Sequence, residues 1–209
     1  MRSGPFCTLM KAPVPARKNR RTEILATAAR LFAASGFNGV SIDDLGAEIG
    51  ISGPAIYRYF PGKEAILGEM LVGISRRLRD GAMERVASEQ TPHSALLALI
   101  DFHVEFAIAD RDLIAVQYRD LGSVTERDRR VVRELQSAYT NTWVDVLQKV
   151  YPELTRERAT SGVHAVFGLL NSTPHSVRGG DPAAGRQLRA MAAAALASAG
   201  EMSKGTPRH

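Results

Sequence analysis

The side chains whose types and spacing suit recognition chemistry in this sequence lie between residues 41 and 63. Tyr57 and Arg58 place an aromatic hydroxyl beside a guanidinium, and Lys63 adds an ammonium group a little further along. These groups donate hydrogen bonds and positive charge to anions such as phosphates, and a guanidinium also matches the paired acceptors on the edge of guanine. Such chemistry needs an element that holds the side chains outward from a small core.

The segment that carries these side chains predicts two short helices joined by a tight turn, a helix-turn-helix. Ser41 is placed to cap the first helix, and the carboxylate of Asp44 can bond back to the cap amide. Gly46 lets a second helix cross closely, and Gly50 supplies the left-handed residue that ends the first helix. Ser52 is expected to cap the second helix, whose outward face carries the hydroxyl and the guanidinium.

A short exposed helix of this kind suits the major groove of DNA, while the alternative is a plain helical hairpin without a ligand. The charge distribution favours DNA. The chain has 27 Lys and Arg against 22 Asp and Glu, and its first 63 residues hold nine basic and four acidic residues. The remainder is neutral, so the excess positive charge lies where it can neutralise phosphates and release their counterions.

The sequence offers little support for an enzyme. Asp101, His103 and Glu105 are close in the chain, but on a helix the two carboxylates share a face and the histidine points elsewhere. The five histidines show no paired ligand spacing, and there is no nucleophile elbow, phosphate-binding glycine loop or dinucleotide fingerprint. We therefore expect no catalytic activity, no metal site and no cofactor.

The composition predicts a globular protein of the cytoplasm. The chain has 209 residues, of which 44% are hydrophobic, enough to bury a core in one large or two modest domains. It contains no run of about 18 apolar residues, so no membrane span is expected. Residues 1–18 lack periodicity and predict a disordered basic leader, and the lone cysteine within them, Cys7, excludes an internal disulfide.

The apolar periodicity predicts helices throughout, an all-α fold. Ser35-Gly36 stops the first helix, and Pro61-Gly62 separates the helix-turn-helix from a long amphipathic helix. Outside the helix-turn-helix, the expected helices span residues 19–35, 63–86, 92–109, 111–121, 125–151, 155–171 and 183–199.

The N-terminal residues resemble the TetR family of bacterial transcriptional regulators. The match runs from Arg21 to about Leu71 and is carried by Leu31-Phe32, Gly36-Phe37, Val40-Ser41, Leu45, Gly50-Ile51-Ser52, Ile56-Tyr57, Tyr59-Phe60-Pro61 and Lys63-Glu64. The resemblance implies an all-helical homodimer that binds double-stranded DNA. It implies a DNA-binding domain, here residues 19–64, and a domain for effector binding and dimerisation, here residues 65–209.

The resemblance also implies DNA contacts from eight residues of this segment: Ser41, Ser52, Gly53, Ala55, Tyr57, Arg58, Tyr59 and Lys63. Ser41 and Lys63 would bind phosphates where helices start, and Ser52 and Gly53 would approach the DNA backbone. Many relatives have an aromatic residue at the position of Arg58 and a histidine at that of the following tyrosine. The guanidinium could read a guanine or add a phosphate contact.

An effector pocket is expected among the helices between residues 66 and 150. Its candidate lining is Phe102, His103, Phe106, Tyr118, Tyr139 and Trp143, with ordinary packing as the alternative for each. A mostly apolar lining favours a small hydrophobic or amphipathic effector such as a fatty acid, an acyl-CoA or a xenobiotic. A regulator with no effector, or one that binds DNA only with its ligand, stays open.

The last predicted helix is rich in alanine and has almost no side-chain bulk over residues 189–199, so another helix can approach it closely. We expect it to form a four-helix dimer interface with the preceding helix, through Val163, Val166, Phe167, Leu170, Met191, Ala194 and Ala195. The alternative is a seam within one chain. A dimer places two recognition helices about 34 to 36 Å apart and reads an inverted repeat. Ligand would tilt the helix that starts at Lys63 and release the repressor from its operator.

Overall fold

The computed structural model of the protein describes residues 17–173 and 182–201, and all regular elements in these residues are helices. They are α1 (Arg17–Ser35), α2 (Ile42–Glu48), α3 (Gly53–Ile56), α4 (Lys63–Ser88), α5 (Pro92–Ala109), α6 (Arg111–Asp120), the 3-10 turn η1 (Leu121–Ser123), α7 (Glu126–Val150), α8 (Arg156–Leu170) and α10 (Pro182–Glu201). The predicted all-α fold is confirmed. The predicted leader lies outside the described residues except for Arg17 and Lys18, which begin α1.

The local signals explain where the helices begin and end. The Ser41 hydroxyl accepts the Asp44 amide at 3.1 Å while the Ser41 amide donates to the Asp44 carboxylate at 2.8 Å, so the capping box forms as predicted. Gly36 and Gly50 have φ angles of 78° and 69°, the left-handed conformation that ends α1 and α2. Ser52 differs from the prediction, because its side chain makes no cap hydrogen bond at the start of α3.

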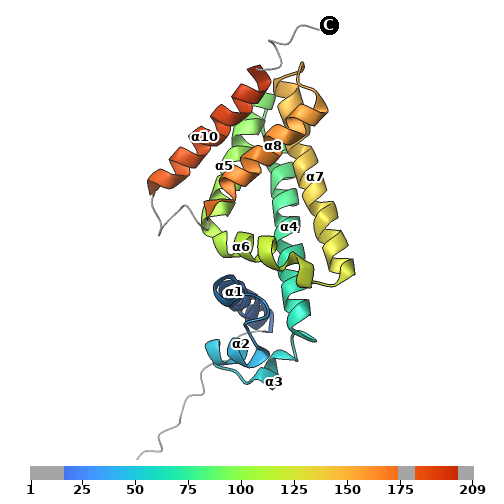
Figure 1. Cartoon of the computed structure of the whole chain (residues 1–209), viewed down its shortest axis with the longest axis vertical. Coiled ribbons are helices and arrows are strands. Elements are labelled where there is room, and N and C mark those ends of the chain that lie inside the picture. The colour runs from blue at the N-terminus through green and yellow to red at the C-terminus, as the bar shows by residue number, and fades with distance from the viewer. Residues whose placement is uncertain (1–16, 174–181, 202–209) are drawn as a thin grey trace, which may run out of the picture.

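Figure 1 shows how the helices are arranged. The helices α1, α2 and α3 form a small unit at one end, and α4 runs from this unit into a larger bundle of α5, α7, α8 and α10. The short helix α6 lies across the molecule between the two parts and contacts α1. It is therefore, together with α4, an element through which a change in the bundle can reach the small unit.

Two hydrophobic cores share α4. The first turns of α4, with Ile66 and Leu71, complete the core of the small unit, to which α6 adds Val116 and α7 adds Val132. From Ile74 onward, the buried side chains of α4 belong to the core of the bundle. The predicted division at residue 64 marks the start of α4, and the packing passes from one core to the other about two turns later.

Among the described residues, α5 is long and apolar enough to cross a membrane by length and composition. In the structure it is a core helix, packed against α4, α7, α8 and α10. Its side chains at Leu99, Ile100 and Val104 are buried in the bundle, which accounts for its apolar composition.

Candidate DNA interface and effector cavity

The crossing of α2 and α3 is close enough to require glycine. A β-carbon on Gly46 would lie 2.6 Å from the carbonyl oxygen of Ile51 and 3.0 Å from the amide nitrogen of Gly53, both rigid backbone atoms. The predicted role of Gly46 is confirmed. Gly53 is itself buried against Asp43, so its α-carbon packs inside the motif. A close approach to the DNA backbone would need this α-carbon to face solvent, which it does not.

The outward face of the motif carries the predicted recognition side chains. Tyr57 is 56% exposed, Arg58 and Ser52 are exposed, and Ala55 and Tyr59 are half-buried. Within the described part of the chain, the Arg58 guanidinium has no hydrogen bond or ion pair, so it is available to a ligand. Ser41 is exposed too, but its hydroxyl donates to Asp44 at 2.7 Å, and these hydrogen bonds lower the pKa of the Asp44 carboxyl.

Lys63 differs from its predicted role as a phosphate clamp. Its ammonium donates to the carbonyl oxygens of Phe37 and Val40, each at 2.8 Å, and lies 4.4 Å from the centre of the Phe37 ring. The side chain therefore ties the loop between α1 and α2 to the start of α4. Periodicity could not reveal this contact, because it joins residues far apart in the chain.

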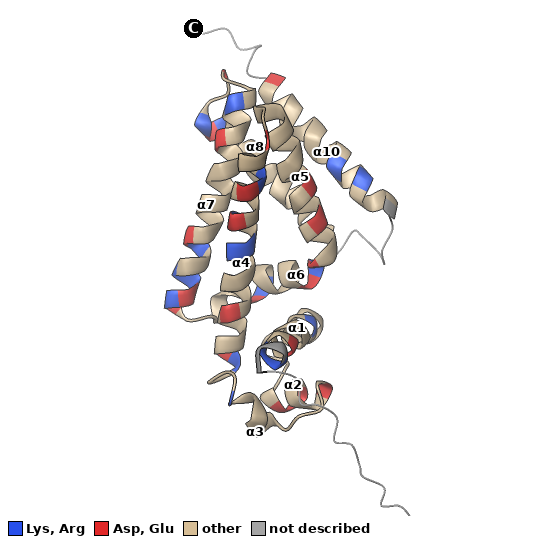
Figure 2. Ribbon diagram, turned by 180° about the vertical axis from the view of Figure 1, so that it is seen from behind, with Lys and Arg blue, Asp and Glu red and all other residues tan. Residues whose placement is uncertain are grey.

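Other basic residues of the N-terminal segment are also engaged within the chain. Arg30 pairs with Glu48 at 2.7 Å, Arg20 pairs with Glu23 at 2.7 Å, and Arg21 pairs with the Glu69 carboxylate of α4. Figure 2 accordingly shows both basic and acidic segments on α1 and acidic segments on α2. The excess charge counted from the sequence overstates what this surface offers to phosphates, because part of it is compensated locally.

The bundle contains a cavity of about 900 Å³ between α4, α5, α6, α7 and α8. Four of the six predicted effector residues line it: His103, Phe106, Tyr118 and Tyr139. The other two predictions are wrong in position. Phe102 lies outside it, with its ring 4.0 Å from the Arg85 guanidinium, and Trp143 is fully buried behind the wall, edge-on to Phe167.

The cavity is more polar than the sequence predicted. Beyond the six candidate residues, its lining includes ten polar or charged residues: Ser75, Gln117, Arg133, Gln136, Ser137, Thr140, Asn141, Thr160, His164 and Asn171. A signal for four of them exists. Arg133, Gln136, Ser137 and Thr140 follow helical spacing on the same helix as Tyr139, which indicates a polar stripe facing a shared space.

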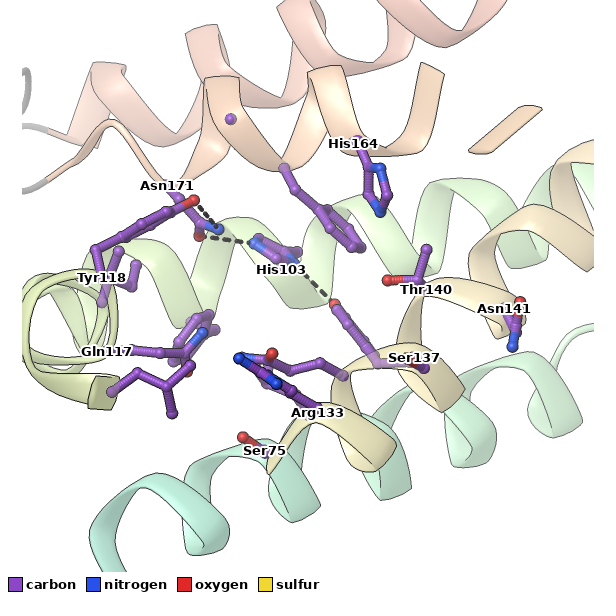
Figure 3. Close-up of a pocket in the computed structure, with 18 of the residues that line it drawn as sticks. Ser75, His103, Gln117, Tyr118, Arg133, Ser137, Thr140, Asn141, His164 and Asn171 are labelled. Atoms are coloured by element: carbon purple, nitrogen blue, oxygen red, sulfur yellow. Dashed lines mark hydrogen bonds between the residues drawn. The ribbon is translucent and has the colours of Figure 1, made fainter. Parts of the chain in front are cut away.

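A chain of hydrogen bonds crosses the wall of this cavity (Figure 3). The Tyr139 hydroxyl lies 2.8 Å from His103 Nδ1, Asn171 Oδ1 lies 3.0 Å from Nε2, and Asn171 Nδ2 donates to the Tyr118 hydroxyl at 3.5 Å. With Oδ1 as an acceptor, Nε2 must carry the proton and Nδ1 accepts from the tyrosine. Burial lowers the pKa of His103 to about 4 and raises that of Tyr139, so both groups are neutral near pH 7.

The helix α6 joins the cavity to the small unit. Gln117 and Tyr118 line the cavity, while the next residue, Arg119, donates to the carbonyl oxygens of Phe32 and Ala33 at the end of α1. The Phe32 carbonyl also accepts the Gly36 amide at 2.8 Å, so the guanidinium adds further hydrogen bonds to the last turn of α1 from outside the helix. Movement of α6 by a ligand would therefore act directly on α1.

The predicted dimer residues divide into two groups. Val163, Val166 and Leu170 are buried in the core of their own chain, and Phe167 lines the cavity, so these four are corrected: the seam between α8 and α10 lies within one chain. On α10, the remaining three predicted residues are exposed: Met191, Ala194 and Ala195. The apolar spacing of α8 marked its buried side and could not say which partner covers it.

The residues considered for catalysis do not converge. Asp101 pairs with Arg189 of α10, and the carboxylate of Glu105 lies 3.9 Å from the guanidinium of Arg85. His103 points instead into the cavity wall. Within the described residues, no cluster of histidine, cysteine and acidic side chains is arranged to hold a metal ion.

Comparisons with known proteins agree with this architecture. Residues 24–70 match the family profile described as bacterial regulatory proteins, tetR family, and residues 89–175 match the Tetracyclin repressor-like C-terminal domain. The transcriptional repressor KstR2 of Rhodococcus jostii is 29% identical over 133 residues, which cover 63% of this chain and 65% of that repressor, just under two thirds of its length.

Two solved structures show the same fold. The ketosteroid transcriptional regulator KstR2 of Mycobacterium tuberculosis superposes with a TM-score of 0.76 at 21% identity, over 89% of this chain and 96% of that one. AibR, solved in complex with isovaleryl coenzyme A and operator DNA, superposes with a TM-score of 0.71 at 18% identity, over 84% and 97%.

Proposed function

Because the chain belongs to the TetR family of bacterial transcriptional regulators, we propose that it is a repressor that a small amphipathic molecule releases from its operator. In this proposal a homodimer in the cytoplasm holds an inverted-repeat operator, and the effector binds in the cavity of the bundle. The observation that carries the proposal is the position of α6, which lines the cavity on one side and donates hydrogen bonds to the last turn of α1 on the other.

The DNA side of the proposal rests on exposed side chains that the chain itself leaves free. Tyr57 and Arg58 project from the motif, and α3 is held in place by the close crossing at Gly46. We assign Arg58 to a base edge or a phosphate in the major groove, with Tyr57 and Ser52 on the neighbouring backbone. Lys63 supports them by fixing the loop before α2.

The regulatory side of the proposal is a shift between two populations. A ligand that contacts both Tyr118 of α6 and Ser75 of α4 would favour an arrangement in which both helices move relative to α7. Through the hydrogen bonds of Arg119, α1 and the recognition helix would move with α6. The distance between the two recognition helices of the dimer would then no longer match the distance between successive major grooves. Filling the cavity therefore weakens operator binding.

The dimer in this proposal uses the outward faces of α8 and α10. Ala165 of α8 and Met191, Ala194 and Ala195 of α10 are exposed and small or flexible, so two copies can pack these helices closely. Val163, Val166 and Leu170, on the inner face of α8, hold α10 in place and thereby support the interface.

The experiment that tests this function measures fluorescence anisotropy of the full chain with the DNA upstream of its own gene and with a shuffled control, across a salt series. We expect preference for the native fragment that persists at physiological salt, because base readout adds to phosphate contacts. Equal, salt-sensitive binding to both fragments would contradict sequence-specific regulation.

Variants in the motif separate two roles. Tyr57→Ala should weaken binding to all sequences alike, whereas Arg58→Ala, as a base reader, should change the preference among operator variants. Uniform losses for both variants on every sequence would assign Arg58 to a phosphate contact.

A further inference from the structure

We propose that the effector is an organic anion with a hydrophobic body, and that Arg133 pairs its negative charge at the mouth of the cavity. This inference rests on the proposed function in one respect, namely that the cavity between α4 and α8 is the effector site. It adds the chemical class of the ligand and the residue that selects it.

The charges around the cavity carry the inference. Its lining contains no aspartate or glutamate, and Arg133 is its one permanently charged residue among those described. Some arginines of the bundle have acidic partners: Arg77 pairs with Asp110, Arg156 with Asp145 at 2.7 Å, and Arg189 with Asp101, whereas others among the described residues, such as Arg130, have none. Within the described residues, the Arg133 guanidinium lies in no such pair. Figure 3 shows it entering the cavity from α7, on the side of Ser75 and Gln117.

The rest of the cavity lining carries no permanently charged side chain. The imidazole of His103 is fixed between Tyr139 and Asn171, which occupy both ring nitrogens. Apolar side chains stand beside this polar wall, with Phe106, Ile114 and Phe167 among them. A ligand that satisfies the whole site therefore has an apolar body and one anionic end. Arg133 is exposed, so a neutral ligand would leave its guanidinium to water, whereas a carboxylate or phosphate would bind it through two parallel hydrogen bonds.

Two sources of such an anion fit the surroundings. A free carboxylic acid would lie inside the cavity with its carboxylate on Arg133. A coenzyme A thioester is longer and would extend into a second hollow of about 480 Å³ on α7, which shares Arg133, Ser137 and Asn141 with the cavity. This hollow adds the carboxylates of Glu126, which pairs with Arg129, and Glu134. It also adds Arg130, the further cation that would bind a phosphate. Arg130 therefore matters for the thioester alone.

Trp143 provides a direct measurement, because it is the single tryptophan of the chain and packs against Phe167 and Tyr139 at the back of the cavity. The full-length protein, without DNA, is titrated with decanoate, decanoyl-CoA and the neutral 1-decanol while Trp143 fluorescence is recorded. We expect the better anion to bind at least about tenfold more tightly than decanol, since a hydrogen bond between charged groups is worth this much.

Substitutions identify the anchor. Arg133→Gln should weaken anion binding about tenfold or more and leave decanol binding within about twofold. Arg127→Gln, an exposed arginine on the same helix outside both hollows, is the matched control and should change neither. Loss in Arg130→Gln for decanoyl-CoA alone would identify the thioester, and its absence would identify the free acid.

Three results would overturn the proposal: decanol binding as tightly as the anions, equal anion binding by wild type and Arg133→Gln, or no binding of either anion. The failure of the proposed function gives a different pattern. Anion binding that depends on Arg133 but leaves operator affinity unchanged would contradict the repressor mechanism and keep this inference. Operator release by decanol, undiminished in Arg133→Gln, would contradict only the inference.

Discussion

The buried His103 should make the stability of this protein fall in mildly acidic solution, and the size of the effect can be worked out. Its ring is buried and hydrogen-bonded as a neutral group, and burial lowers its pKa from 6.5 to about 4. Between these two values the unfolded chain binds a proton that the folded chain does not. Stability contributed by neutral His103 is therefore complete above pH 6.5 and is lost as the pH falls toward 4.

The magnitude follows from the shift. Each pKa unit corresponds to about 1.4 kcal/mol, so the full effect is about 3 kcal/mol, of which about 2 kcal/mol is already lost at pH 5. The assay is urea unfolding at pH 7.5 and pH 5 for the wild type and His103→Gln at one fixed protomer concentration. Other titrating groups, including Asp44, contribute equally to both proteins and cancel.

The wild type should lose about 2 kcal/mol more than His103→Gln over this interval, because glutamine does not titrate. A difference below about 0.5 kcal/mol would refute the reasoning, since it would mean that the ring accepts a proton in the folded protein at little cost. Such a result would also weaken the description of the cavity wall as a neutral array.

Three further predictions concern packing, coupling and assembly. Gly46→Ala should lower the free energy of unfolding by about 1 to 3 kcal/mol, measured by thermal unfolding, and abolish operator binding. The control Gly73→Ala, whose β-carbon would have open space around it, should be neutral or stabilising in the same assay. Arg119→Met should lower stability by about 1 to 2 kcal/mol and reduce the effect of effector on operator affinity. The control Arg111→Met, at an exposed arginine of α6, should leave both unchanged. Equal coupling in the two variants would show that the bonds from Arg119 to α1 do not transmit the effect of the effector. Ala195→Glu should convert the dimer into a monomer with much weaker operator binding, measured by light scattering and anisotropy, and an intact dimer would move the interface elsewhere.

Local structure was predictable because its causes are local. The capping box at Ser41, the left-handed Gly50 and the crossing at Gly46 depend on neighbouring residues, and each appears in the structure as predicted. The bounds of α5 were predicted to the residue, since Pro92 fits a first helical turn and the apolar pattern ends at Ala109.

Contacts between distant residues were not predictable in the same way. From the sequence, Lys63 is expected to be a free cation, but in the fold its ammonium donates to the carbonyls of Phe37 and Val40. Similarly, Trp143 and Tyr139 lie one turn apart on α7, yet one is sealed in the core and the other borders the cavity, because the facing helices decide which side is hollow.

The apolar stripe of α8 raises the same ambiguity in another form. Periodicity identifies the stripe that contains Val163 and Leu170 but not whether α10 of the same chain or a second chain covers it. Arg133 was overlooked because a basic residue near the start of a long helix usually faces water, and its position at the cavity follows only from the placement of α4 and α6 against α7.

The central claim is that filling the cavity weakens operator binding through α6. The most direct test measures anisotropy of the wild-type protein on its operator fragment, with and without a ligand shown by Trp143 fluorescence to occupy the cavity. We predict at least about a tenfold loss of affinity at saturation, which lies within the usual range for coupling between two sites. Operator affinity that is unchanged or increased at saturation would contradict it.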